Sequence, residues 1–366
     1  MAIRGHMRKH NFNAGPSALP LPVLEEMQRT MVDYHGAGLS IMEASHRSTE
    51  YDDVHESALS GLRALLDVPE THEVLLLGGG ATMQFAMVPM NLMPPGGQAD
   101  IVLSGSWAQK ALADIKKLGT ANIVFDGAES GFTTLPEPAG LHPSPGAAYL
   151  HITTNETIGG LQWKDFPGTG DVPLVADMSS DILSRRIDVS RFGLIYAGAQ
   201  KNLGPAGVTV VVIRKDLVDR CPESLPSYLS YRTHAKGNSL YNTPPVFAIY
   251  ALSLVMNWIT STGGLDAVAK QNVSKSATLY RVIDSSPEFY RCPVDQRYRS
   301  DMNVVFRLPS EELEKRFIAE AGEQNMVGLK GHRSVGGIRA SIYNAVPPES
   351  VEALSEFMRD FMARNG

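Results

Sequence analysis

Short apolar runs recur along the first two thirds of the chain, and most of them end in glycine or a polar residue. Stretches with apolar residues on one helical face lie between them. This alternation extends from about residue 73 to residue 213 and favours a mostly parallel sheet with helices on both faces. The strands are predicted at residues 74–77, 101–103, 172–176 and 194–196, and within the segment 207–217.

Helical patterns flank this region. One helix is predicted to begin near Pro22, another follows the SHRS motif at residues 45–48, and a long apolar helix is predicted from Pro245 to Trp258. Beyond the glycine pair at residues 263–264, strands and helices follow one another in a compositionally distinct tail. This tail indicates a separate α+β lobe.

The domain boundaries follow from this change of pattern. We predict a large domain at residues 16–256 and a small domain at residues 257–366, to which the N-terminal arm at residues 7–15 belongs. Residues 1–6 look like an added leader, with Met7 as the natural start.

Composition excludes several classes of protein. The 366 residues are 43% hydrophobic and 20% charged, enough for one large core or two unequal cores. The net charge of −6 argues against nucleic acid or an anionic membrane surface as a partner. No apolar run could span a bilayer, and the N-terminal residues MAIRGHMRKH contain no apolar stretch that would suggest secretion, so we expect a cytoplasmic protein. Cys221 and Cys292 are far apart and lack metal-ligand spacing, so we expect free thiols and no metal site.

An acid and an amine follow two of the predicted strands. Asp177 ends the run at residues 172–176, and Lys201 follows the strand at residues 194–196. Open α/β sheets bind ligands outside the carboxyl ends of their strands. A lysine there could form an imine with pyridoxal phosphate (PLP), while a carboxylate keeps the pyridine nitrogen protonated. Taken singly, Lys201 could equally be a solvated surface charge and Asp177 a helix cap or turn residue.

A glycine turn at residues 78–80 lies between a predicted strand and a predicted helix. The N–H groups of Ala81 and Thr82 would then be free to bind a phosphate at the helix N-terminus. The spacing matches neither a dinucleotide fingerprint nor a P-loop, and the turn could serve packing alone. Trp107, at another helix start, could stack on a cofactor ring or belong to the core. Thr157 could bond a phenolic oxygen or be a turn residue.

Candidate anion-binding side chains lie in two loops. His46 and Arg47 precede a predicted helix, and His332, Arg333 and Arg339 lie in the glycine-rich segment 331–345. Arginine binds carboxylate or phosphate as a rigid two-pronged donor. These residues are therefore candidates for holding a substrate anion, although each alone could be an ordinary surface residue or a partner of a helix dipole.

Several motifs, in this order, carry a family resemblance: SHRS, GGGATMQF, SGSWAQKA, TNETIGG, ADMSSDILSR, YAGAQKNLGPAG, YNTPP and GHRSVGGIRASIYNA. From about Asn11 to the C-terminal helix, the chain resembles the phosphoserine aminotransferases, a group of class V, fold-type-I PLP enzymes. The resemblance implies an α/β fold, with a large domain built on a mostly parallel seven-stranded sheet and a smaller α+β C-terminal domain. It also implies a homodimer with shared active sites.

The resemblance assigns cofactor-binding roles. Lys201 would form the imine with PLP and act as general base, and Asp177 would pair with the pyridine nitrogen. Trp107 would stack on the ring and Thr157 would bond its phenolic oxygen. The phosphate would be held by Ala81, Thr82 and Gln200, and by Asn242 and Thr243 of a second subunit. Some similar proteins have an arginine at the position of Ala81 or Thr82, a departure from part of the family.

The resemblance also implies the substrates. Arg339 would bind the α-carboxylate, and the distal anion would be held by His46, Arg47, His332 and Arg333, across the subunit interface. The implied reaction moves an amino group between O-phospho-L-serine or 3-phosphooxypyruvate and 2-oxoglutarate or L-glutamate, by a ping-pong mechanism in serine biosynthesis. Some relatives also process 4-phosphohydroxy-L-threonine in vitamin B6 biosynthesis.

Three other functions remain open at this point. An alanine–glyoxylate or serine–pyruvate aminotransferase would share Lys201 and Asp177 but would not need a cationic distal pocket. A cysteine desulfurase would need a mobile catalytic cysteine, for which the contexts of Cys221 and Cys292 give no support. A non-catalytic nucleotide-binding module would use the glycine turn but would leave Lys201 without a role.

Overall fold

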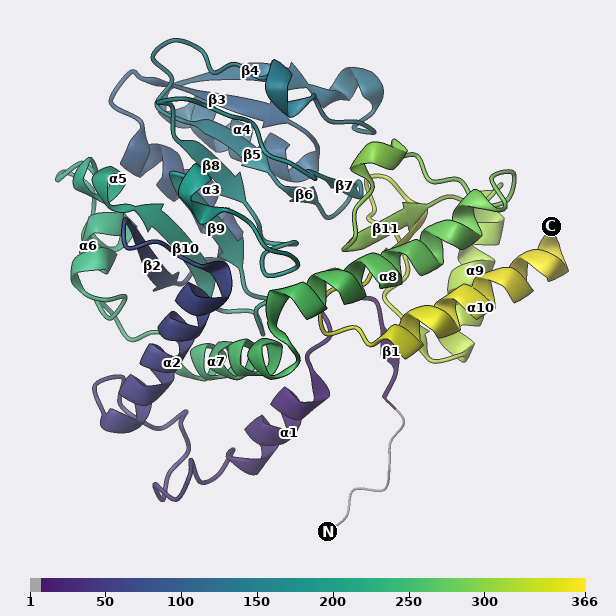
Figure 1. Ribbon diagram of the computed structural model, residues 1–366, viewed down its shortest axis with the longest axis horizontal. Helices are drawn as coiled ribbons and strands as arrows, with labels where there is room; N and C mark the ends of the chain where they lie inside the picture. The colour runs from purple at the N-terminus through teal and green to yellow at the C-terminus, as the bar shows by residue number, and fades with distance from the viewer. Residues whose placement is uncertain (1–7) are drawn as a thin grey trace.

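The computed structural model describes residues 8–366, so the predicted leader at residues 1–6 and the predicted start at Met7 lie outside the described residues. A seven-stranded sheet forms the centre of the larger lobe (Figure 1). Neighbouring strands from β4 to β9 are parallel, while β10 is antiparallel to both β9 and β2. The prediction of a mostly parallel seven-stranded sheet is confirmed. The strands, in spatial order, are β2 (His72–Leu77), β10 (Thr209–Arg214), β9 (Leu194–Gly198), β8 (Leu174–Asp177), β5 (Leu150–Thr153), β3 (Gln98–Leu103) and β4 (Thr120–Asp126).

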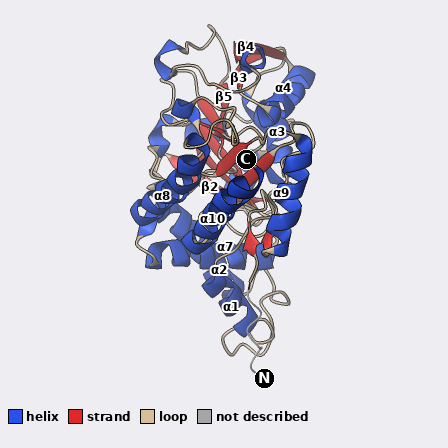
Figure 2. Cartoon of the chain, turned by 90° about the vertical axis from the view of Figure 1, so that its right-hand side faces the viewer, coloured by secondary structure: helices blue, strands red, loops and turns tan. Residues whose placement is uncertain are grey.

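Both faces of this sheet are apolar, because side chains of one strand alternate between two cores. In β2, Val74 and Leu76 pack with α2 (Thr49–Leu66) and α7 (Val246–Ser261). Leu75 and Leu77 pack on the other side with α3 (Gly80–Leu92) and α4 (Ser106–Leu118). Figure 2 shows the strands in the middle of the molecule with helices on either side. Burial on both faces is why these strands are short continuous apolar runs in the sequence.

A second core belongs to the smaller lobe. The helices around it are α8 (Gly264–Asp284), α9 (Glu311–Glu323) and α10 (Pro348–Asn365), packed against the antiparallel pair β11 (Asn303–Phe306) and β13 (Ile338–Ser341). The N-terminal arm contributes Phe12, and its β1 (His10–Asn11) pairs with β12 (Met326–Val327). Helix α8 places Leu265 in the large core and Leu279 in the small one, so it connects the two lobes. The domain boundary near residue 257 stays a prediction.

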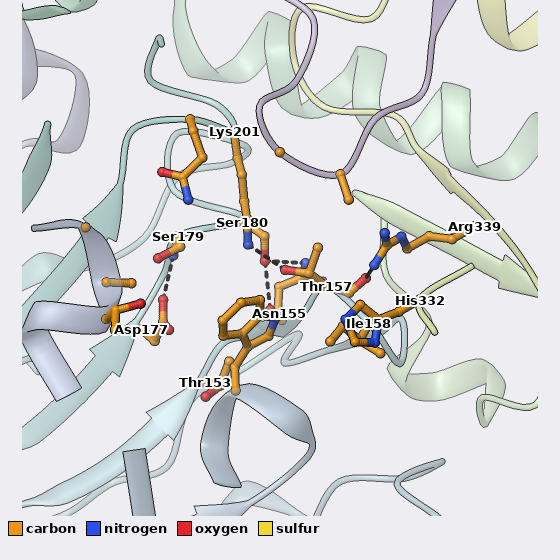
Figure 3. A pocket seen from close by; sticks show the side chains of 17 residues that line it. Thr153, Asn155, Thr157, Ile158, Asp177, Ser179, Ser180, Lys201, His332 and Arg339 are labelled. Atoms are coloured by element: carbon orange, nitrogen blue, oxygen red, sulfur yellow. Dashed lines mark hydrogen bonds between the residues drawn. The ribbon is translucent and has the colours of Figure 1, made fainter. Parts of the chain in front are cut away.

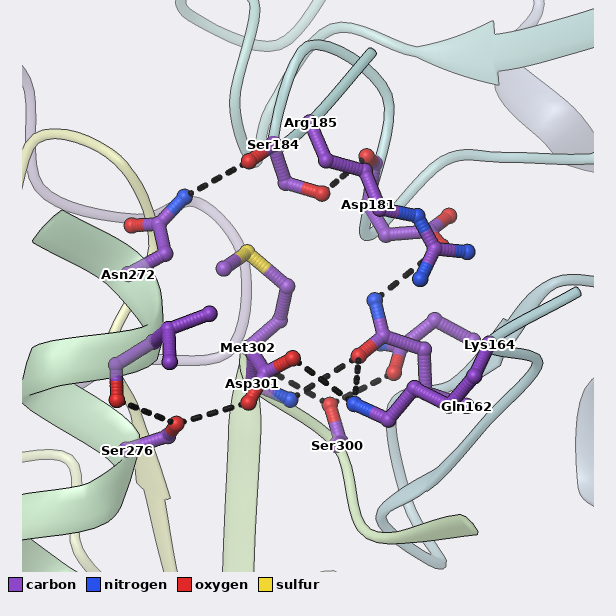
Figure 4. A network of polar contacts seen from close by, with 12 residues as sticks. Gln162, Lys164, Asp181, Ser184, Arg185, Asn272, Ser276, Ser300, Asp301 and Met302 are labelled. Atoms are coloured by element: carbon purple, nitrogen blue, oxygen red, sulfur yellow. Dashed lines mark hydrogen bonds and ion pairs between the residues drawn. The ribbon is translucent and has the colours of Figure 1, made fainter. Parts of the chain in front are cut away.

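Polar contacts also join the lobes (Figure 4). Lys164 follows β7 (Leu161–Gln162), and its Nζ donates to Asp301 Oδ2 at 2.7 Å. Ser276 of α8 donates to the other oxygen of Asp301 at 2.7 Å, and Asn272 donates to the carbonyl of Ser184 at 3.1 Å. These bonds hold α8 against the loops of the large lobe.

The remaining helices and strands are short. They are α1 (Leu21–Arg29), α5 (Lys215–Asp219), α6 (Tyr231–Lys236) and β6 (Asn155–Glu156).

Within residues 8–366 no single helix is long and apolar enough to cross a membrane. Helices α7 and α8 meet that test only as a pair, which is bent by 84° at the break between them.

Candidate active site

A cavity of about 330 Å³ lies where the large lobe, the small lobe and the N-terminal arm meet (Figure 3). Thr153 is paired with Asp177, and Asp177 with Tyr196, so β5, β8 and β9 end close to one another beneath it. The cavity therefore opens at the carboxyl ends of parallel strands, where open α/β sheets bind ligands. The sequence-predicted residues that line it are Ala81, Thr82, Trp107, Thr157, Asp177, Gln200, Lys201, His332 and Arg339.

Lys201 is a buried amine rather than a surface charge. Its side chain comes from the turn after β9, the residue is 8% exposed, and Nζ donates to Thr157 Oγ1 at 2.6 Å. Burial lowers the pKa of Lys201 to about 8, against the opposing effect of the Asp177 and Glu156 carboxylates. With this pKa roughly a tenth of the amine is neutral, and so nucleophilic, at pH 7, whereas for an ordinary lysine the neutral share is below about one part in a thousand.

The backbone around Lys201 is held by residues far away in the sequence. Ser17, two residues beyond the N-terminal arm, donates from its Oγ to the Lys201 carbonyl at 2.6 Å and from its N–H to the Gln200 carbonyl at 3.0 Å. Asn202 accepts a bond from the N–H of Asn344 in the small lobe at 3.0 Å. The turn that carries the amine is thus fixed by both the segment that follows the arm and the small lobe.

Asp177 ends β8 and points into the same cavity (Figure 3). It is 4% exposed, and its Oδ1 accepts a bond from the N–H of Ser179 at 2.9 Å. Within residues 8–366 no hydrogen bond reaches its other carboxylate oxygen. Burial raises the pKa of Asp177, while Ser179 and the charge of Lys201 act in the opposite direction. A cationic donor placed in the cavity would stabilise this carboxylate as an anion.

The glycine turn before α3 forms an anion cradle. Gly79 and Gly80 have φ values of 86° and 65°, a region that favours glycine, and α3 begins at Gly80, the last residue of the turn predicted at residues 78–80. No side chain caps this helix, so the N–H groups of its first turn are available to a ligand. Gly80, Ala81 and Thr82 line the cavity together with Gln200. A phosphate would be bound here by backbone N–H groups and the helix dipole.

The small lobe contributes positive charge to the cavity. Arg339 of β13 donates to the Thr157 carbonyl at 3.4 Å, and no carboxylate of residues 8–366 forms a salt bridge with it. His332 also lines the cavity, and burial together with the charges of Arg339, Arg333 and Lys110 lowers its pKa. Arg333 is exposed and does not line the cavity. These cations form a site for carboxylate or phosphate groups.

Besides Arg333, four predicted residues do not line this cavity. His46 and Arg47 lie in the loop before α2, and Arg47 is exposed. Asn242 and Thr243 precede α7 and line a separate hollow beside Gly78. The resemblance assigned Arg47, Asn242 and Thr243 to a site shared with a second subunit. Their place outside the cavity of their own chain does not contradict this expectation, which stays a prediction.

Sequence reasoning missed several residues around the cavity. The arm residues Ala14 and Gly15 form part of its wall, and Tyr343 holds them by donating to the Ala14 carbonyl at 2.8 Å. Glu156 is a fully buried carboxylate beside Thr157. A polar cluster at residues 153–157 was visible in the sequence, but nothing local showed that the glutamate within it is buried. Lys110, whose Nζ is 4.1 Å from the centre of the Trp107 ring, gave no sequence signal.

Comparison with known proteins agrees with this geometry. Residues 9–354 match the model of the family described as aminotransferase class-V. A phosphoserine aminotransferase of Geobacillus kaustophilus (strain HTA426) is 56% identical over 357 residues, which are 98% of this chain and 99% of the relative. The match covers almost the whole length of both proteins.

Solved structures give the same result. The phosphoserine aminotransferase of Bacillus circulans subsp. alkalophilus matches with a TM-score of 0.96 and 54% identity, over 98% of this chain and 99% of that one. The PLP-bound phosphoserine aminotransferase of Trichomonas vaginalis matches with a TM-score of 0.88 and 36% identity, over 96% and 100%. The fold-type-I architecture and the family resemblance predicted from the motifs are confirmed. The chain belongs to the class-V aminotransferases and, within them, to the phosphoserine aminotransferase family.

Proposed function

We propose that the chain is a PLP-dependent aminotransferase that moves the amino group between O-phospho-L-serine and 2-oxoglutarate, with 3-phosphooxypyruvate and L-glutamate as the other pair. The observation that carries this proposal is the buried Lys201 amine, 2.6 Å from Thr157 in a cavity that also contains Asp177 and Arg339. Relatives at 50–56% identity support this substrate choice over an alanine–glyoxylate or serine–pyruvate enzyme. A role in serine biosynthesis follows from the reaction.

The polar atoms around the cavity fit PLP. Trp107 Nε1, Thr153 Oγ1 and Arg339 Nε are buried, and none has a hydrogen-bond partner in the part of the chain that is described. Such atoms are costly unless a ligand or water satisfies them, and their three residues all line the cavity. The N–H groups at the start of α3 and Gln200 would hold the phosphate, Asp177 the ring nitrogen and Thr157 the phenolic oxygen, with Trp107 stacked on the ring. When bound, PLP supplies an aldehyde that takes the amino group and a ring that accepts electrons.

The chain's own groups supply nucleophile, base and charge. Neutral Lys201 Nζ would hold PLP through the cofactor's aldehyde, and the hydrogen bond to Thr157 orients this amine. With the amino acid substrate bound, the same amine would be the base that takes the proton from the substrate Cα and would later give that proton up. The Asp177 carboxylate would keep a proton on the ring nitrogen throughout.

One pocket would serve both substrates. Phosphoserine and glutamate each carry an α-carboxylate and a distal anion at similar reach. Arg339 would bind the α-carboxylate, and His332 and Arg333, with His46 and Arg47 of a second subunit, would bind the distal anion. Burial, followed by the charges of Arg339, Arg333 and Lys110, lowers the pKa of His332, and these three charges would also attract that anion. Use of 4-phosphohydroxy-L-threonine and a cytoplasmic location stay predictions.

Exposed apolar side chains support a homodimer with shared sites. Val32 is 83% exposed and Met42 is 51% exposed, close in sequence to His46 and Arg47, and Tyr241, next to Asn242, is 52% exposed. Exposed apolar surface of this kind is typical of interaction sites. A two-fold interface through these segments would bring His46, Arg47, Asn242 and Thr243 to the cavity of the other subunit.

Arg47→Ala is expected to raise the KM for both glutamate and phosphoserine, by roughly tenfold or more, because each loses a charge-assisted partner for its distal anion. Steady-state kinetics with each substrate measures this. Unchanged KM values would remove Arg47 from the pocket.

Mixed dimers test whether Arg47 acts across the interface. A Lys201→Ala chain paired with an Arg47→Ala chain forms one site with both residues intact only if Arg47 serves the other subunit. At substrate concentrations well below KM, where the Arg47→Ala protein keeps only about a tenth of the wild-type rate or less, random mixing of the two variants should then restore roughly one quarter of the wild-type activity, because half of the dimers are mixed and each has one complete site. If Arg47 serves its own subunit, the activity of the mixture should not exceed the average of the two variants.

The lowered pKa of Lys201 predicts the pH dependence of cofactor attachment. The neutral amine is the nucleophile, so the rate of covalent attachment of PLP to the cofactor-free protein should rise with pH and level off above a midpoint near 8. An ordinary lysine, with a pKa of 10.5, would keep gaining rate well above that pH. Stopped-flow absorbance over a series of pH values measures the midpoint, and a value near 10.5 would show that the amine is not desolvated.

Substrate profiling tests the function itself. The purified holoenzyme should convert glutamate and 3-phosphooxypyruvate to 2-oxoglutarate and phosphoserine, and should use alanine with glyoxylate far less efficiently. The reverse preference would exclude the proposed substrates. A cysteine desulfurase is disfavoured because burial raises the pKa of both Cys221 and Cys292, and neither lines the cavity.

A further inference from the structure

Glu156 is a carboxylate buried beside the cavity without lining it. The residue is 0% exposed, and its two oxygens accept bonds from the backbone N–H of Trp107 at 3.2 Å, the N–H of Ala108 at 3.1 Å and the hydroxyl of Ser104 at 3.3 Å. All three donors belong to the start of α4 or to the residues just before it. Glu156 therefore occupies the place of an N-cap side chain for a helix whose own N-cap, Gly105, has none.

The carboxylate is packed directly against this helix start. A Cβ atom on Gly105 would lie 2.6 Å from Glu156 Cδ, closer than any real contact, so only glycine leaves room for the acid. The other end of the residue is fixed as well, because the Glu156 carbonyl accepts a bond from the Gly160 N–H at 2.8 Å. Neither α4 nor β6 can shift at this point without moving the other.

The two neighbours that Glu156 ties together are both residues of the proposed cofactor site. Trp107, which it holds through the backbone N–H, lines the cavity and is placed to stack on the ring. Thr157 directly follows it in the chain, and its Oγ1 accepts the bond from Lys201 Nζ at 2.6 Å. The nearest alternative is a purely structural role, in which Glu156 caps α4 and contributes to stability alone.

We infer that Glu156 is a positioning residue that sets Trp107 relative to Thr157 and Lys201, and thereby fixes the plane in which the cofactor ring is held. This inference rests on the proposed PLP-dependent function. Helix capping alone would require an acceptor for the N–H groups of α4, but it would not require that acceptor to be the residue next to Thr157. Glu156 accepts a bond from the Trp107 backbone and is joined to Thr157 by a peptide bond. The orientations of Trp107 and Thr157 therefore both depend on the Glu156 side chain.

The Glu156→Gln holoenzyme tests this inference. The amide keeps the size of the side chain, but its NH2 group cannot accept the bonds that one carboxylate oxygen now accepts. We expect a changed visible circular dichroism band of bound PLP and a kcat reduced by roughly ten- to a hundredfold, as for a small misplacement of reacting groups. The KM for glutamate should change less than kcat, because Glu156 acts on Arg339 only indirectly, through the carbonyl of Thr157 to which Arg339 donates. Glu156→Asp, which retains the charge, should recover part of the kcat.

Asp181→Asn is the matched control. Asp181 is also a buried carboxylate, held by Thr154 and Gln162, but it does not line the cavity. Its variant should lower thermal stability and leave the circular dichroism band and kcat close to those of the wild type. A folded Glu156→Gln protein with wild-type values for both would overturn the inference, whatever its stability.

Gly105→Ala serves if Glu156→Gln does not fold. It displaces the carboxylate without removing it and should change the dichroism band and kcat in the same direction, whereas wild-type values in the folded variant would contradict the inference. Failure of the proposed function is a separate result, since the wild-type protein itself would then show no PLP band and no transamination.

Discussion

Lys201→Ala is expected to abolish transamination. If Lys201 has the two roles proposed above, the variant loses both the nucleophile for the cofactor aldehyde and the base that moves the substrate proton. General base catalysis alone contributes roughly 10²- to 10⁴-fold, and loss of the covalent role adds to this, so kcat should fall by at least about 10⁴-fold. No other lysine lines the cavity, so within the described part of the chain no side chain is placed to substitute for it. Steady-state turnover at saturating PLP measures the effect.

The chain contains its own control for this experiment. Lys275 is a second buried lysine, 2% exposed, and burial lowers its pKa to about 7. Its Nζ donates to the carbonyls of Ile342, Tyr343 and Val346 and is outside the cavity. A low pKa alone would make both lysines reactive, whereas position in the cavity selects Lys201. After borohydride reduction of the holoenzyme, peptide mass spectrometry should find the cofactor on Lys201. An adduct on Lys275, or an active Lys201→Ala variant, would contradict the assignment.

The sheet and its two best site residues were predictable because their signals are local. Each buried parallel strand is a short apolar run, and the residue type after the run shows what the strand presents at its carboxyl end. Asp177 is the last residue of β8, and Lys201 follows β9. Both line one cavity because these two strands are parallel neighbours whose carboxyl ends lie at the same edge of the sheet. The order of the strands brings the carboxylate and the amine together, whereas the two residue types can be read from the sequence alone.

The other walls of the cavity could not be predicted in this way. Ser17 bonds to the carbonyl of Lys201 across 184 positions of sequence, and Arg339 reaches the Thr157 carbonyl across 182. Such pairs depend on how the arm and the small lobe pack, which no local pattern encodes. Glu156 was missed for the same reason, because nothing in the polar stretch around a glutamate shows that the start of a distant helix will cover it. Asn242 and Thr243 were assigned through the family resemblance alone, as was the place of Arg47 in the site of a second subunit, and a single chain does not test these assignments.

Asp177→Asn is expected to impair the chemistry while leaving the covalent bond between PLP and Lys201 intact. Asparagine can keep the bond from the Ser179 N–H, but its neutral amide cannot stabilise a proton on the ring nitrogen. Removing one partner of a buried ion pair costs about 3–5 kcal/mol. Since 1.36 kcal/mol corresponds to a factor of ten in rate, kcat should fall by roughly 10²- to 10⁴-fold. Turnover and the visible spectrum of the holoenzyme measure the two parts of this prediction.

Two comparisons separate the charge of Asp177 from its packing. Asp181→Asn removes a buried carboxylate four residues further on that does not line the cavity, and its kcat should stay within about threefold of the wild type. N-methylated PLP carries a fixed positive charge on the ring nitrogen, so it should restore much of the activity of Asp177→Asn without needing the carboxylate. If Asp177→Asn keeps a wild-type kcat, or if the methylated cofactor binds and restores nothing, then Asp177 does not act by holding a proton on the ring. The electron-accepting role of the cofactor would then have to depend on another group in the cavity.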